Sequence, residues 1–130
     1  MTEERRDALW DKGLATRREV VGDSYVDKSL ESMDDFSDAL QDYITRYAWG
    51  DVWNRPGLGR RDRSLLNIGM LIALGWEAEL KLHLKGALRN GVTREEIKEA
   101  ILQSAIYCGG PAALEATRVA REAFADVGED

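Results

Sequence analysis

The sequence predicts an all-α protein, a bundle of five or six helices. Apolar residues recur at helical spacing along the chain, and no alternating pattern of useful strand length occurs. Proline is scarce, with Pro56 and Pro111 only, and glycine follows several of the apolar stretches, as it commonly does at helix ends. The chain has 130 residues, the length of one domain. We therefore expect a single domain over residues 1–130.

Two main helices are expected in the first part of the chain. The first spans residues 3–21 and stops at Gly22, and a short turn or helix follows at residues 26–30. The second starts near Asp34 and ends at Trp49 and Gly50. Its apolar residues are spaced four, four and three apart, which predicts one stripe facing a core. They are Phe36, Leu40, Ile44 and Tyr47.

The remaining helices follow a long irregular connection at residues 49–63. A helix over residues 61–74 is apolar nearly all round, which in a small protein indicates a subunit interface. The next spans 76–91, with its inner stripe at Leu80, Leu84, Ala87 and Leu88. Thr93 and Glu96 form a capping box that opens another helix, and Pro111 fits the first turn of the last one. The face of the capped helix expected to be buried comprises Ile97, Ile101, Ala105 and Cys108, with Leu102 and Ile106 alongside.

Composition excludes several classes of function. The net charge is −6, from 24 acidic and 18 basic residues, which argues against a nucleic-acid partner. No apolar run approaches the ~20 residues of a membrane span, and residues 1–10 lack the apolar segment of a signal peptide. Cys108, the single cysteine, cannot form an internal disulfide or a CxxC motif. We therefore expect a cytoplasmic protein.

One stretch is locally basic and aromatic. It could bind an anionic small molecule, or it could be a solvated face of helix-terminal arginines. Trp49 and Trp53 lie in the expected connection, where Trp53 would either contact a ligand or plug the core from the loop side. The arginines of this stretch are Arg46, Arg55, Arg60, Arg61 and Arg63.

His83 is the only histidine and the main candidate for chemistry. It lies three residues after Leu80 and four before Ala87, so it borders the inner stripe of its helix. Glu79, four residues earlier, could reach the imidazole, fix its tautomer and raise its basicity. Such a pair is a usable general acid or base near neutral pH. The alternative is an exposed Glu–His pair on the helix surface.

Other catalytic constellations fail. Glu79 and His83 supply two metal ligands where a catalytic site needs about three, so no metal is expected. The serines lack a G-x-S-x-G elbow, and the glycines follow no strand that could form a phosphate loop. Cys108 on an apolar face is expected to be a small core residue.

Two segments carry a resemblance to a known family. RYAWGDVWNRPGLGRRDRSLLNIGMLIAL (46–74) and ELKLHLKGALRNGVTREEIKEAILQSAIYCGGPAA (79–113) closely resemble the carboxymuconolactone decarboxylase and alkylhydroperoxidase-like superfamily. The similarity covers roughly residues 10–125, and RYAWGDVW with RPGL is typical of the decarboxylases themselves. The resemblance implies an alkylhydroperoxidase-like all-α fold and a ring-like homohexamer. It also implies a cofactor-free decarboxylation in protocatechuate catabolism, through the β-ketoadipate pathway.

The redox members of that superfamily carry C-x-x-C-x-x-x-H at the start of the matching helix. Trp76, Glu79 and His83 occupy those three positions here. Both thiols are gone and the histidine is kept, which disfavours dithiol peroxidase chemistry and favours acid–base use of His83. Two alternatives stay open: a peroxidase-like or isomerase relative on the same fold, and a non-catalytic helical assembly module, in which His83 would be exposed.

The implied reaction converts 4-carboxymuconolactone into 3-oxoadipate enol-lactone and carbon dioxide. The ring double bond and lactone carbonyl can accept the electrons of the departing carboxylate, so no cofactor is needed. We expect His83 to donate a proton, or a hydrogen bond to the lactone oxygen, while Glu79 orients it or itself carries the proton. Trp49, Trp53 and Trp76 would exclude water. The dianionic lactone would be held through its carboxylates by arginines: Arg46, Arg55, and also Arg61 or Arg63.

Overall fold

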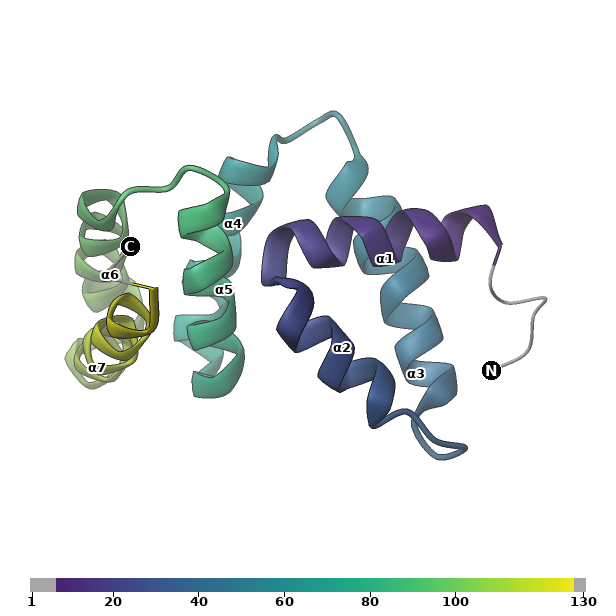
Figure 1. The fold of residues 1–130 in the computed structure, drawn as a ribbon. Coiled ribbons are helices and arrows are strands. Elements are labelled where there is room, and N and C mark those ends of the chain that lie inside the picture. Colours follow the sequence, from purple (N-terminus) through teal and green to yellow (C-terminus); the bar gives the residue numbers. More distant parts are fainter. Residues whose placement is uncertain (1–6, 128–130) are drawn as a thin grey trace. The chain divides into compact units, whose positions relative to one another are not determined.

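The computed structural model describes residues 7–127 and confirms the all-α class (Figure 1). This part of the chain forms helices α1 to α7, a π-helix and a short 3₁₀-helix, and it contains no strand. The chain divides into two compact units, Met1–Arg60 and Arg61–Asp130. We describe each unit by itself.

The N-terminal unit starts with α1 (Ala8–Val21), α2 (Asp23–Glu31) and α3 (Asp38–Tyr43). The Asp7 carboxylate caps α1 by accepting hydrogen bonds from the backbone N–H groups of Leu9 and Trp10. Gly22 ends α1 with a φ of 92°, as expected for glycine at a helix end. The predicted helix start at residue 3 lies outside the described residues. The short segment predicted at residues 26–30 belongs to the full helix α2.

A π-helix, η2 (Ile44–Asp51), continues α3, and the 3₁₀-helix η3 (Val52–Asn54) follows it directly. The predicted helix end at Trp49 and Gly50 is therefore wrong, because the chain stays helical to Asn54 in wider and then tighter turns. The predicted irregular connection at 49–63 shrinks accordingly to residues 55–59.

Helices α1 and η2 pack closely together because glycine occurs on each of them. A Cβ atom on Gly13 of α1 would overlap the carbonyl oxygen of Thr45. A Cβ atom on Gly50 of η2 would lie 2.8 Å from the carbonyl oxygen of Leu9. This approach buries Thr45 completely.

The stripe predicted to face a core in this region is largely exposed. Phe36 is 98% exposed, Leu40 59% and Tyr47 48%, while Ile44 is partly buried. Phe36 also precedes α3, in a turn rather than in the helix. Helical spacing shows which side chains share a face, but it cannot show whether another element covers that face.

The C-terminal unit is built from α4 (Arg60–Leu74), α5 (Glu77–Arg89), α6 (Arg94–Cys108) and α7 (Gly110–Val127). Gly75, with a φ of 73°, makes the turn between α4 and α5. The predicted capping box of Thr93 and Glu96 opens α6, and both of its hydrogen bonds are present. Helix α7 packs against α5 and α6. The core of this unit includes Ile68, Ile72, Leu80, Leu84, Ile97, Val119 and Ala123.

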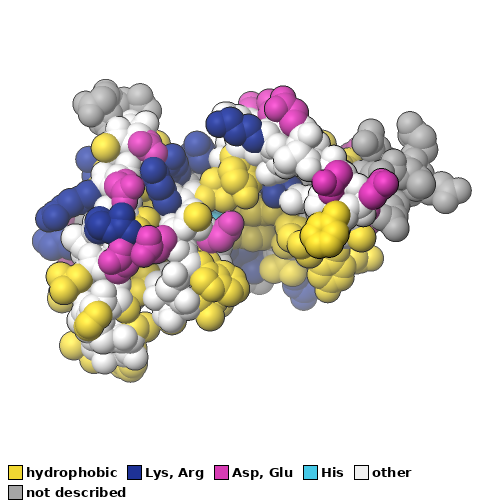
Figure 2. Space-filling view, turned by 90° about the horizontal axis from the view of Figure 1, so that it is seen from below, with side chains coloured by type: hydrophobic (Ala, Val, Ile, Leu, Met, Phe, Trp, Pro, Cys, Tyr) yellow, Lys and Arg dark blue, Asp and Glu magenta, His cyan; other side chains and the backbone are white. Residues whose placement is uncertain are grey.

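Several large apolar side chains of α4 and α6 remain on the surface. Figure 2 shows hydrophobic side chains among charged ones on one face of the molecule. The 61–74 helix was predicted to be buried on several sides, but the other helices of this chain leave part of it exposed. Leu102 and Ile106, predicted beside the buried face of α6, are 60% and 79% exposed. Cys108 is exposed too, so its predicted place in the core is wrong. The exposed apolar residues of α4 and α6 are Leu66, Met70, Leu74, Leu102, Ile106 and Tyr107.

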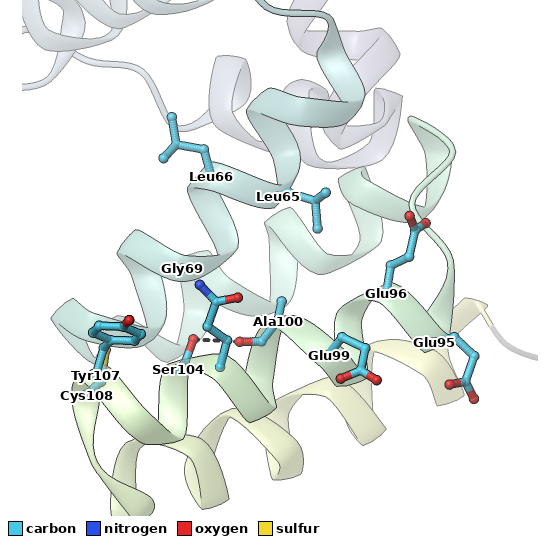
Figure 3. A pocket seen from close by; sticks show the side chains of 11 residues that line it. Leu65, Leu66, Gly69, Glu95, Glu96, Glu99, Ala100, Ser104, Tyr107 and Cys108 are labelled. Carbon is cyan, nitrogen blue, oxygen red and sulfur yellow. Dashed lines mark hydrogen bonds between the residues drawn. The ribbon is translucent and has the colours of Figure 1, made fainter.

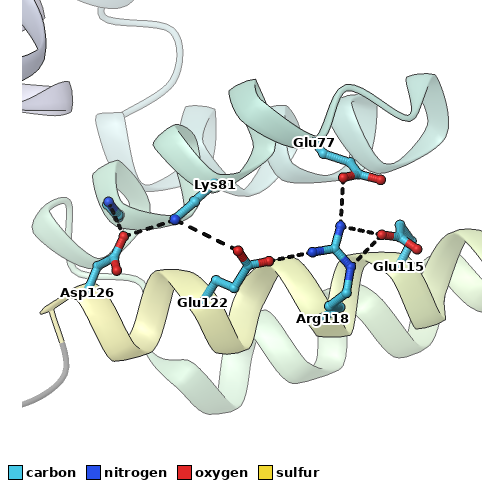
Figure 4. A network of polar contacts seen from close by, with 7 residues as sticks. Glu77, Lys81, Glu115, Arg118, Glu122 and Asp126 are labelled. Atoms are coloured by element: carbon cyan, nitrogen blue, oxygen red, sulfur yellow. Dashed lines mark hydrogen bonds and ion pairs between the residues drawn. The ribbon is translucent and has the colours of Figure 1, made fainter.

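An ion-pair network joins α5 to α7 on the surface (Figure 4). Arg118 of α7 lies at its centre, with Glu77 of α5 at 2.6 Å and Glu122 at 2.5 Å. Lys81 of α5 pairs with Asp126 at 3.2 Å. Within residues 7–127, no helix is long and apolar enough to cross a membrane.

Candidate active site

His83 is buried, as its place beside the inner stripe of its helix predicted. The side chain lies on α5 and is 9% exposed. Leu80 and Leu84 on the same helix belong to the hydrophobic core. The alternative of an exposed Glu–His surface pair is therefore excluded for the imidazole, although Glu79 itself is exposed.

Asn67 is a partner of His83 that the sequence analysis missed. The amide Nδ2 of Asn67, on α4, lies 3.0 Å from the imidazole Nδ1. The two residues are 16 positions apart, and the turn at Gly75 lies midway between them. A second polar contact joins the same helices, from Asn90 Nδ2 to Ser64 Oγ at 2.9 Å. Only the folding of α4 against α5 brings these pairs together, so helical spacing could not reveal them.

Burial lowers the pKa of His83 to about 4. The protein interior solvates the imidazolium poorly, so the neutral ring is favoured. The prediction that Glu79 would make His83 more basic is therefore wrong in direction. The imidazole is neutral at pH 7 and carries a single N–H.

The other candidate residues of the C-terminal unit lie on α4 and at the start of α5. Trp76 is the N-cap residue of α5 and is 57% exposed. Arg61 forms ion pairs with Glu96 of α6 and with the neighbouring Asp62. Arg63 is partly buried on α4. In this unit the structure thus places a cation-rich first turn of α4 on the helix that also carries Asn67.

Arg46, in the N-terminal unit, already binds carboxylates of its own chain. Its guanidinium contacts Asp42 at 3.0 Å and Asp7 at 2.9 Å, and its side chain is 12% exposed. The hydrogen bond from Arg46 lowers the pKa of Asp7. A guanidinium in this position has the donor geometry that suits a carboxylate.

Trp49 and Trp53 form a buried aromatic pair in the same unit. They are 6% and 9% exposed, and their rings stack with centroids 5.0 Å apart. Arg55 follows on the exposed segment after η3. Trp53 is buried, and it lies in η3 rather than in the predicted loop.

Asn54 ties the backbone of this aromatic segment to α1, and the sequence analysis did not single it out. Its Nδ2 donates to the carbonyl oxygens of Trp49 at 2.8 Å and Gly50 at 3.2 Å. The same amide nitrogen lies 2.9 Å from Thr16 Oγ1 on α1. The change from π to 3₁₀ turns lies at this end of the helix, and Asn54 binds two carbonyl groups there.

An open groove of about 810 Å³ lies between α4 and α6 (Figure 3). Its apolar lining includes Leu65, Leu66 and Ala100, and Glu95 and Glu99 lie at one end. None of the predicted site residues lines this groove. In the described range 7–127, no group of three or more His, Cys, Asp or Glu side chains is placed to hold a metal ion.

Comparison with known proteins assigns the family. Residues 38–122 match the carboxymuconolactone decarboxylase family. The chain belongs to this family. It is 47% identical to the 4-carboxymuconolactone decarboxylase of Acinetobacter baylyi, over 98% of this chain and 93% of that protein.

Two further relatives extend the comparison. The nitrosuccinic acid decarboxylase npaB of Metarhizium robertsii is 44% identical, over 92% of this chain and 83% of its own. A 4-carboxymuconolactone decarboxylase of Pseudomonas putida is 48% identical over 42 residues, which are 32% of this chain and 88% of that protein. All three relatives are named decarboxylases, but the names give two different substrates, 4-carboxymuconolactone and nitrosuccinic acid.

Proposed function

We propose that this protein is a carboxy-lyase that converts 4-carboxymuconolactone into 3-oxoadipate enol-lactone and carbon dioxide without a cofactor. The observation that carries the proposal is the single histidine, which is buried and electrically neutral on a helix of a carboxymuconolactone decarboxylase family member. The identity of 47% to a 4-carboxymuconolactone decarboxylase over nearly the whole chain supports the choice of substrate.

The substrate supplies most of the chemistry. When the carbon–carbon bond to the carboxylate breaks, its electron pair moves through the ring double bond to the lactone carbonyl oxygen. The resulting dienolate is then protonated on carbon to give the product. The protein has to bind a dianion, stabilise the oxygen on which charge develops, and provide a proton.

His83 fits the second of these tasks best. A ring with a pKa of about 4 holds almost no imidazolium at pH 7, but its N–H can donate a hydrogen bond to the developing dienolate oxygen. Of the two roles predicted for His83, we therefore favour the hydrogen-bond donor. Glu79 is exposed on the same helix, and we propose that it carries the proton.

Arginine side chains are proposed to bind the two carboxylates. Arg46 has the geometry for this, since it already binds Asp42 and Asp7. Arg61 pairs with Glu96, which a substrate carboxylate would have to displace. We keep Arg55 and Arg63 as further carboxylate binders, and the tryptophans predicted to exclude water as substrate contacts: Trp49, Trp53 and Trp76.

The decisive experiment follows carbon dioxide release from 4-carboxymuconolactone by the purified protein, with no cofactor added. We expect turnover by the unmodified chain and a loss of kcat of about 10²-fold or more in His83→Gln, which keeps the fold. Cys108→Ser, which changes an exposed thiol, is the matched control and should keep full activity. Nearly full turnover in His83→Gln would refute the assigned role.

Two control assays separate the alternatives. A hydroperoxide with a thiol reductant should give no turnover, because the chain lacks the thiol pair of the redox relatives. Nitrosuccinate should be a poorer substrate than the lactone, although a relative is named for that acid. A higher kcat/KM on nitrosuccinate than on the lactone would make nitrosuccinate the proposed substrate. The protein would still be a decarboxylase.

We further propose that the protein works as a homo-oligomer, a homohexamer as the family resemblance implies. The exposed apolar side chains of α4 and α6 support this, since a second copy would remove them from water. Light scattering after size exclusion should give the mass of six chains. Leu102→Glu should lower that mass, whereas a monomeric unmodified chain would refute the oligomer.

A further inference from the structure

The contact between Asn67 and His83 joins the middle of α4 to the middle of α5. The amide nitrogen Nδ2 lies 3.0 Å from the imidazole Nδ1. The residues that follow each of them along the chain, Ile68 and Leu84, are almost completely buried in the core of this unit. The contact between Asn67 and His83 therefore lies beside the hydrophobic core of this unit.

The two nitrogen atoms in contact determine where the ring proton sits. A carboxamide nitrogen is a donor only, so a hydrogen bond with it requires a lone pair on Nδ1. A neutral imidazole carries one N–H, and with Nδ1 accepting, that proton lies on Nε2. A carboxylate at the same place would do the opposite, because it accepts and so requires a proton on Nδ1.

We propose that Asn67 is a positioning residue that holds His83 in the Nε2–H tautomer, so that Nε2 donates a hydrogen bond to the oxygen that becomes negative as carbon dioxide leaves. This role rests on the proposed function. It differs from the role predicted for Glu79, because a carboxylate at Nδ1 would leave Nε2 as an acceptor that repels the developing charge. The choice of an amide over an acid at position 67 thus determines whether the ring stabilises the dienolate.

The tautomer of His83 can be measured directly, because the chain contains one histidine. In protein labelled with ¹⁵N-histidine, two-bond ¹⁵N–¹H correlations at pH 7 distinguish Nε2–H, Nδ1–H and imidazolium. The unmodified protein should show the Nε2–H form alone. Asn67→Asp should show Nδ1–H or imidazolium instead. A wild-type pattern in Asn67→Asp, or an Nδ1–H pattern in the unmodified protein, would overturn the proposal.

Two further variants keep the measurement conclusive. Asn90→Asp makes the same chemical change on an asparagine that contacts Ser64 rather than His83, and should keep the Nε2–H pattern. If Asn67→Asp does not fold, Asn67→Ala removes the donor without adding a charge. Its spectrum should gain an Nδ1–H component, and an unchanged Nε2–H pattern would overturn the proposal.

Kinetics of the same variants on 4-carboxymuconolactone test the catalytic consequence. Asn67→Asp should lose about tenfold or more in kcat with little change in KM, while Asn90→Asp keeps both. A changed tautomer with unchanged kcat would overturn the positioning role. If the unmodified protein itself does not release carbon dioxide, the proposed function fails, and the spectra still report whether Asn67 sets the tautomer.

Discussion

The indole rings of Trp49 and Trp53 stack with centroids 5.0 Å apart and an angle of 25° between their planes. Trp49 belongs to the π-helix η2 and Trp53 to the 3₁₀-helix η3, so the stack spans the point at which the helix changes its pitch. Asn54 donates to the carbonyl groups of Trp49 and Gly50 at that point. The aromatic pair therefore depends on a side chain that touches its backbone.

Asn54→Ala should destabilise the protein and loosen the tryptophan pair. The change leaves two carbonyl groups and Thr16 Oγ1 without the amide that binds them, a loss of about 1–3 kcal/mol in the free energy of unfolding. Urea denaturation measures the loss, and near-ultraviolet circular dichroism reports the indole pair. The control is Asn90→Ala, whose side chain makes one hydrogen bond, to Ser64. An unchanged near-ultraviolet circular dichroism spectrum in Asn54→Ala would contradict the claim that Asn54 holds the tryptophan pair in place.

Gly13→Ala should be among the most destabilising single-methyl additions in the chain. Its Cβ would overlap the carbonyl oxygen of Thr45, and backbone atoms on both helices would have to move apart. Overpacking of this kind costs about 1–3 kcal/mol or more. Gly110→Ala is the matched control, because nothing lies within 4 Å of the added Cβ. Equal urea midpoints for the two variants would contradict the close packing of α1 on η2.

Stability should depend on pH through His83. The pKa of the imidazole is about 4 in the folded chain and 6.5 as its ordinary value, so between these pH values the unfolded chain binds more protons. Protonation of His83 in the unfolded chain therefore lowers the free energy of unfolding as the pH falls below 6.5. The loss reaches about 3 kcal/mol near pH 4 and is absent well above pH 6.5. His83→Gln should lose less stability than the unmodified chain between pH 6.5 and 4. If the free energy of unfolding fell equally with pH in both proteins, the lowered pKa of the buried imidazole would be contradicted.

The α5–α7 ion pairs should contribute little to stability. Arg118, Glu77, Glu115 and Glu122 have side chains about half exposed, so water and salt screen their attraction. We expect Arg118→Gln to lower the urea midpoint slightly at low salt and not at about 1 M sodium chloride. Cys108→Ser, on an exposed residue outside the network, is the control. A large loss that persists at high salt would show that the network holds α7 in place.

The ends of the helices in the C-terminal unit were predictable from the sequence. The capping box of Thr93 and Glu96 and the glycines Gly75, Gly91 and Gly109 act within a few residues of themselves. Local rules therefore locate them without knowledge of the fold. The π-helix η2 was not predictable in this way. It packs against α1, where Gly13 lies against Thr45 and Gly50 against Leu9, and these pairs are distant in sequence.

Residues predicted to be buried are buried only where another helix of the same chain packs over them. Leu80, Leu84 and Ala87 are buried as expected, since α4, α6 and α7 share their core. Leu102, Ile106 and Phe36 are exposed despite their apolar character. A hydrophobic pattern predicts that a helix face is covered. It does not show whether a neighbouring helix or a second copy of the chain covers it.

The sequence by itself determined the all-α class, the helix ends of the C-terminal unit and the choice of His83, because each follows from residue types and short spacings. Only the tertiary structure decided that His83 is neutral and that Asn67, rather than an acid, lies at its Nδ1. The physical reason is that solvation and hydrogen-bond partners depend on atoms brought together across the turn at Gly75. No periodicity along one helix contains that information.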